Sequence, residues 1–77
     1  MKYTVIGIEN VDYVNKSQKH IQGVRLHMTF EDPKKANGHM VEQAFVSHDV
    51  VPTVLLPGDD IQLHYNKYGR PESIEVL

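Results

Sequence analysis

The clearest pattern in the chain is the strict alternation of apolar and polar residues over positions 24–31. Val24, Leu26, Met28 and Phe30 share one face, and polar side chains occupy the other. A period of two is typical of a β-strand with one face buried and the other in water. We therefore predict a half-buried strand here.

The closing segment, residues 56–76, predicts a β-hairpin. A Pro-Gly-Asp corner precedes it, and two alternating stretches flank the turn at residues 66–70. Ile61 and Leu63 lie on the inward face of the first stretch. Tyr65 continues that face, so we expect its ring to belong to the core.

Two further stretches, residues 2–9 and 40–47, are apolar on both faces. Burial on two sides is expected for a covered barrel strand or for a subunit interface. Gly7 interrupts the first stretch and predicts a bulge or a tight bend. The connection at residues 10–19 predicts a hairpin that protrudes from the main sheet, with its tip near residues 15–18.

Residues 47–55 are the one place with room for helical structure, at most a short helical turn, with Ser47 or Asp49 as its cap and Pro52 near its first turn. The order is thus three strands, a connector and two strands. This order predicts an all-β domain spanning residues 1–77, a small five-stranded barrel like the OB-fold. An SH3-like barrel has a similar number and length of strands and is the alternative.

The composition is that of an ordinary globular domain, with 40% apolar and 23% charged residues and no cysteine. Disulfides and thiolate metal sites are therefore excluded. The amino terminus enters a strand pattern at once, without an apolar run suited to a signal peptide or a membrane span. A cytoplasmic protein without membrane contact is expected.

The net charge of −2 hides an uneven distribution. Residues 13–20 and 66–70 carry +4 and no acid, whereas the other 64 residues carry −6. Solvated turns often collect lysines, which is the simpler explanation. The alternative is that two positive tips were kept for an anionic partner.

In an OB-like barrel, these two segments would flank the ligand-binding face. Cations neutralise phosphates, and unpaired bases stack on aromatic rings, so such loops suit single-stranded nucleic acid. Arg25 would extend the basic track across the sheet unless it pairs with Glu42. The candidate nucleic-acid-binding residues are Tyr13, Lys16, Lys19, Arg25, Lys67, Tyr68 and Arg70.

Catalysis and metal binding are not expected. Residues 47–49 read Ser-His-Asp, but a catalytic triad is assembled from distant positions. The five histidines lack cysteine partners and the spacings of metal sites. We therefore predict a protein that is not an enzyme and has no cofactor or small-molecule substrate.

The chain resembles the small OB-fold single-stranded-DNA-binding proteins of filamentous phages and related mobile elements. The likeness lies in length, strand order, absence of cysteine, and tyrosines beside basic residues near the tips at 13–19 and 65–70. The resemblance implies a homodimer that binds DNA cooperatively, with residues 3–8 and 40–46 suited to the dimer interface. The acidic net charge departs from the pattern of many such binders.

Two other functions stay open. A protein-interaction or structural barrel of a phage or mobile element, without nucleic-acid binding, accounts more easily for the acidic charge. RNA in place of DNA is a further possibility, because no residue identifies a contact to a 2′-hydroxyl.

Overall fold

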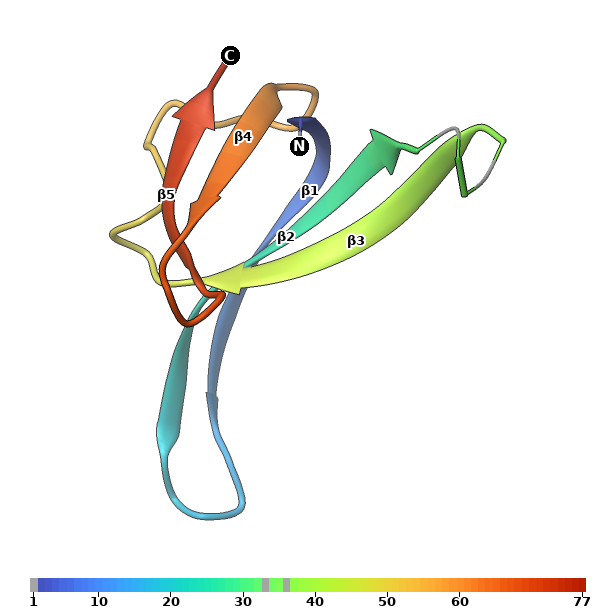
Figure 1. Cartoon of the computed structure of the whole chain (residues 1–77). Helices are drawn as coiled ribbons and strands as arrows, with labels where there is room; N and C mark the ends of the chain where they lie inside the picture. Colours follow the sequence, from blue (N-terminus) through green and yellow to red (C-terminus); the bar gives the residue numbers. More distant parts are fainter. Residues whose placement is uncertain (1, 33, 36) are drawn as a thin grey trace.

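The computed structural model describes residues 2–32, 34–35 and 37–77. These residues form five β-strands and no helix (Figure 1). The strands are β1 (Lys2–Val14), β2 (His20–Glu31), β3 (His39–Val46), β4 (Asp60–Tyr65) and β5 (Pro71–Val76). The predicted all-β class and the five strands are confirmed.

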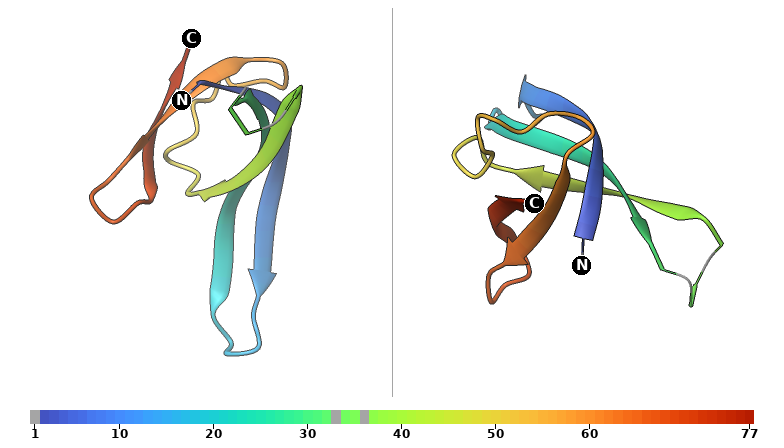
Figure 2. Two further views of the ribbon diagram at one scale, coloured as in Figure 1. Left: turned by 45° about the vertical axis from the view of Figure 1, so that its right-hand side comes forward. Right: turned by 90° about the horizontal axis from the view of Figure 1, so that it is seen from above.

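All strand pairs are antiparallel, and the order across the sheet is β3-β2-β1-β4-β5. Because β4 returns to lie beside β1, the first four strands form a Greek key. Within the described residues no ladder joins β3 to β5, so the sheet has two edges and is not closed. The sheet is coiled, and the two edge strands contact each other (Figure 2).

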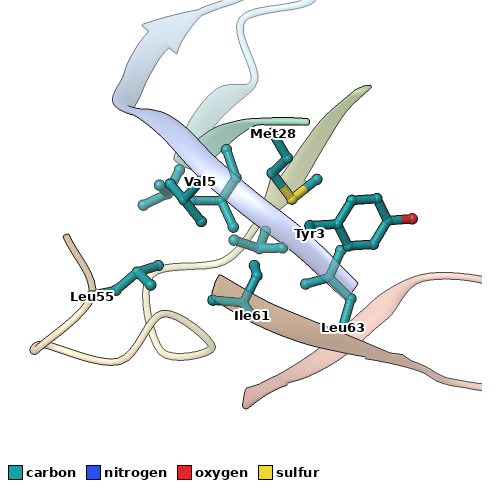
Figure 3. Packing of buried hydrophobic residues seen from close by; sticks show 9 residues of the cluster. Tyr3, Val5, Met28, Leu55, Ile61 and Leu63 are labelled. Carbon is teal, nitrogen blue, oxygen red and sulfur yellow. The ribbon is translucent and has the colours of Figure 1, made fainter. Parts of the chain in front are cut away.

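The inward faces of the strands enclose a small apolar core (Figure 3). The largest fully buried side chains are Val5, Leu26, Met28 and Ile61. Leu55, from the connector between β3 and β4, is buried against the same cluster. The alternation predicted for residues 24–31 is confirmed, because its apolar side is the side that faces the core.

A β-bulge at Ile6 changes which side chains of β1 face inward. The register with β2 shifts between Val5 and Gly7, which confirms the predicted irregularity. One extra residue in a strand reverses the faces of the residues after it. Ile8 therefore packs on the core with Val5, whereas the Ile6 side chain is 55% exposed.

The connector at residues 47–59 contains turns and no helix, which is within the predicted limit of at most a short helical turn. Backbone N–H groups of Val50 and Val51 donate to the carbonyls of Ser47 and His48, three residues earlier. The segment does not continue as a helix beyond this point, since Pro52 disfavours helical geometry in the residue before it.

In the described part of the chain there is no helix long and apolar enough to cross a membrane.

The β1–β2 hairpin extends well beyond the other strands (Figure 1). The ladder continues to the pair of Val14 and His20, so the predicted protruding hairpin is confirmed. We call residues 12–22 the arm; none of them is buried. The arm accounts for the elongated dimensions of 43 × 26 × 26 Å.

Candidate nucleic-acid interface

The tip of the arm is a tight turn organised by Asn15. The Asn15 N–H donates to the Lys19 carbonyl (2.9 Å), and the Gln18 N–H donates to the Asn15 carbonyl (3.0 Å). Asn15 Oδ1 accepts from the N–H groups of Ser17 (2.9 Å) and Lys19 (3.0 Å). Gln18 has φ = 62°, the left-handed geometry that closes a three-residue hairpin loop.

The tip between β4 and β5 repeats these bonds around Asn66. The Asn66 N–H donates to the Arg70 carbonyl (2.8 Å), and the Gly69 N–H donates to the Asn66 carbonyl (3.0 Å). Asn66 Oδ1 accepts from the N–H groups of Tyr68 (2.9 Å) and Arg70 (3.0 Å). Gly69 has φ = 78° and occupies the position of Gln18.

The two tips therefore present their cations at equivalent positions, the first and the fourth residue after the asparagine. We call these side chains the tip cations; they are Lys16, Lys19, Lys67 and Arg70. All four residues are exposed. Among the ion pairs found in the described part of the chain, none involves a tip cation. Their charges are thus available to an external anion.

Both tips project toward the same end of the molecule, with the arm reaching farther (Figures 1 and 2). The loop between β2 and β3 lies at the opposite end and carries Lys34 and Lys35, which are also exposed. The predicted site residues at the two tips thus lie on two separate projections, with the tip between β4 and β5 near the base of the arm, instead of on one continuous surface (Figures 1 and 2).

Tyr68 and Tyr13 differ in how they are placed. Tyr68 lies in the second tip with 76% of its surface exposed, and the Lys67 ammonium lies over its ring, 5.2 Å from the centroid. Tyr13 lies on β1 opposite Ile21, two residues before Asn15, and is half exposed. Both rings are accessible to a base.

The prediction that Tyr65 belongs to the core is wrong, because its side chain is 48% exposed. The register of β4 and β5 shifts between His64 and Tyr65, where β5 carries one extra residue, Glu72, and Tyr65 ends β4 beyond the buried Ile61 and Leu63. Burial, followed by hydrogen bonding to Glu42 and to Tyr65, raises the pKa of the Tyr3 hydroxyl above its ordinary range. Tyr65 therefore lies at the rim of the core.

Arg25 lies on the outer face of the sheet and is engaged by Glu9 on β1, at 3.2 Å from Nη1 to Oε1. His27 Nε2 lies 3.1 Å from the same carboxylate oxygen. Hydrogen bonding to His27, followed by the charge of Arg25, lowers the pKa of Glu9. The partner of Arg25 is thus Glu9 and not Glu42, and its charge is less available than those of the tip cations.

Four of the histidines each face a carboxylate on a neighbouring strand. The pairs are His20 with Asp12, His27 with Glu9, His39 with Glu31, and His64 with Glu75. The hydrogen bond to His20 is the largest cause of a lowered pKa at Asp12. No group of three or more potential metal ligands occurs among the residues the structure describes.

Phe45 is an exposed aromatic residue that the sequence analysis did not select. It lies on β3 opposite Arg25, and its ring covers Gly23: a Cβ at Gly23 would lie 2.4 Å from the ring. Val41 and Ile6 are exposed on the same outer face. The signal available in the sequence was the spacing of Val41 and Phe45, which share one side of their strand.

Comparisons with known protein families, with curated proteins and with solved structures found no match to this chain. Its function is therefore inferred from the geometry and the charge of the two tips.

Proposed function

We propose that the protein is a non-enzymatic binder of single-stranded nucleic acid, DNA in the first instance, and that the two tips are its contact surface. The observation that carries the proposal is the repeated tip: two turns with the same hydrogen bonds, each presenting two cations that have no carboxylate partner among the described residues. The tip cations neutralise phosphates, and Tyr13 and Tyr68 stack on bases.

Order in the tips before binding supports this role. Each tip satisfies its backbone donors through its own asparagine, so little conformational entropy remains to be lost when a ligand binds. Arg25 and Phe45 lie together on the outer face of β2 and β3 and would extend the contact across the sheet. Arg25 would contribute less than the tip cations, because Glu9 already engages it.

The fold is compatible with an OB-like barrel. A Greek-key sheet of five strands whose edge strands contact each other is the arrangement expected of a partly open barrel. In such a barrel the loops between strands 1 and 2 and between strands 4 and 5 flank the ligand, and these loops are the two tips.

A second function, protein interaction, is favoured by the apolar outer face. Ile6 and Val41 are exposed there, and with His27 and Gln43 they line a hollow of about 360 Å³. We propose a second copy of the chain as the partner on this face, which would make the binder a homodimer. The mass of the purified protein measured by light scattering tests this point directly, since a monomer at every concentration rules it out.

The test of the main proposal compares three double variants of equal charge. Lys16→Ser/Lys19→Ser and Lys67→Ser/Arg70→Ser each remove two tip cations, and Lys34→Ser/Lys35→Ser removes two cations at the opposite end. Fluorescence anisotropy with labelled oligothymidine is expected to show losses on the order of tenfold for each tip variant. The Lys34/Lys35 variant is the matched control and should retain most of the affinity.

Equal losses in all three variants would mean that total charge, and not the tips, controls binding. Absence of binding by the unmodified protein at low salt would overturn the proposal itself. Labelled oligouridine in the same assay decides between DNA and RNA.

A further inference from the structure

The two tips share a backbone and differ at the residue between their cations. Ser17 and Tyr68 are equivalent, because each donates its N–H to the Oδ1 of the tip asparagine, at 2.9 Å in both tips. Both side chains are exposed. The molecule therefore presents the same cationic turn twice, once with a hydroxyl and once with an aromatic ring at its apex.

The Tyr68 ring has no structural role that accounts for its position. Tyr68 is not a member of the core cluster formed by the described residues. It is the most exposed of their large hydrophobic side chains. The Lys67 ammonium lies over the Tyr68 ring in a cation–π arrangement. A cation on one face leaves the other face of the ring available to a flat, apolar partner.

We propose that Tyr68 gives the second tip a preference for unpaired bases, whereas the turn with Ser17, apart from Tyr13 on the strand before it, contacts phosphates without regard to strandedness. This inference rests on the proposed function and assigns different tasks to its two tips. Phosphates are exposed in both duplex and single strands, so a cationic turn alone does not distinguish them. The faces of bases are available for stacking only where they are not already stacked in a duplex.

The expected contribution is large enough to measure. Stacking of one base on an aromatic side chain corresponds to a change of about 5- to 150-fold in affinity. Truncation of Tyr68 should reduce affinity for a single strand by a factor in this range. Affinity for a duplex, or for an abasic phosphodiester strand, should change little because neither offers a free base.

The experiment measures affinity for labelled oligothymidine, for a duplex and for an abasic strand, each at the same low salt concentration. Tyr68→Ser makes the second tip match the first at this position and should lower the ratio of single-strand to duplex affinity. Tyr68→Phe keeps the ring and should retain the ratio. Ser17→Tyr places a ring on the first tip and should raise it. Val54→Ser, an exposed apolar residue of the connector, is the control and should leave the ratio unchanged.

A Tyr68→Ser variant that keeps the ratio, or that loses single-strand, duplex and abasic affinity equally, would overturn this inference while leaving the proposed function intact. A protein that binds none of the three probes would overturn both. Circular dichroism of each variant confirms that the sheet is retained, which is expected since the changed side chains are exposed.

Discussion

The strands β1 and β2 form the arm and also run through the rest of the sheet, which we call the body. The two regions differ in how many of their residues are buried. In the body, β2 places Leu26 and Met28 in the core, fully buried. In the arm, the same strand and its partner have no buried residue between positions 12 and 22. An isolated two-stranded hairpin is at best marginally stable, so the arm depends on the body. Its length therefore adds little buried surface to the fold.

The hairpin of β4 and β5 also combines buried residues in a strand with exposed residues at its tip. Ile61 and Leu63 anchor β4 in the core, whereas every residue from Lys67 to Arg70 is exposed. Four of the eight lysine and arginine residues lie in the two projecting tips, whereas carboxylates on the sheet pair with histidines, with Arg25 or with Lys2. Under the proposed function, stability and ligand contact thus depend on different residues, so each can be changed without the other.

The largest effect on stability is expected in the body. Leu26→Ala should lower the free energy of unfolding by about 2–5 kcal/mol, because it removes a fully buried side chain and leaves a cavity. Tyr13→Ala in the arm should change it by no more than about 0.5 kcal/mol, as for surface substitutions generally. Urea denaturation followed by circular dichroism measures both. A comparable loss in the two variants would show that the arm is part of the cooperative core.

A smaller effect, on binding alone, is expected from the asparagines that organise the tips. Asn66→Ala removes the acceptor of the Tyr68 and Arg70 N–H groups without changing charge. We expect oligothymidine affinity to fall about 2- to 10-fold, since the backbone of the turn, which these bonds hold in place, must then be ordered on binding. Asn15→Ala is the matched change in the arm and should have a similar effect. Unchanged affinity in both variants would mean that order in the tips does not matter for binding.

The smallest effect concerns the junction of β1 and β4, far from either tip. The Thr4 hydroxyl donates to Asp60 Oδ1 at 2.7 Å, and this bond, followed by Lys2, lowers the pKa of the Asp60 carboxyl. A pKa lowered by folding stabilises the protein above the ordinary value of about 3.9, and the contribution is lost as the pH falls through the lowered value. The Thr4→Val variant removes the bond.

The difference in unfolding free energy between wild type and Thr4→Val should therefore be greatest near neutral pH and should shrink as the solution is acidified below about pH 4. Thermal unfolding at a series of pH values measures this difference. Oligothymidine affinity at neutral pH should not change, because the junction contributes no tip cation. A difference independent of pH would show that the bond to the ionised Asp60 carboxyl is not its source.

Local patterns predicted most of the strands. The alternation in β2, the bulge near Gly7 and the protruding hairpin all follow from side-chain period and from turn residues, which act over a few positions. The outward position of Ile6 and the exposure of Tyr65 could not be predicted in the same way. The first depends on a residue inserted in β1, which exchanges the two faces of that strand, and the second depends on where the buried core ends along β4.

The pairing of Glu9 with Arg25 and the repeat of the two tips could have been predicted from the sequence. Counting back along both strands from the closing pair of Asn15 and Lys19 places Glu9 opposite Arg25. The repeat of Asn-Lys at positions 15–16 and 66–67, followed by a basic residue three positions later, is visible in the sequence. The ring of Phe45 over Gly23 depends on the pairing of β2 with β3, which is not a local feature of the sequence. Pro33 cannot donate to a ladder and is therefore also predicted to end the second strand, but this residue lies outside the described part of the chain.

The central claim, that four tip cations bind the phosphates of a single strand, is tested most directly by the salt dependence of affinity. For the unmodified protein and oligothymidine, the slope of log affinity against log salt concentration should be about −2.8, because each phosphate contact on a single strand contributes about −0.7. Either tip variant should reduce it to about −1.4. Binding that is indifferent to salt, or a slope that the tip variants leave unchanged, would contradict the account.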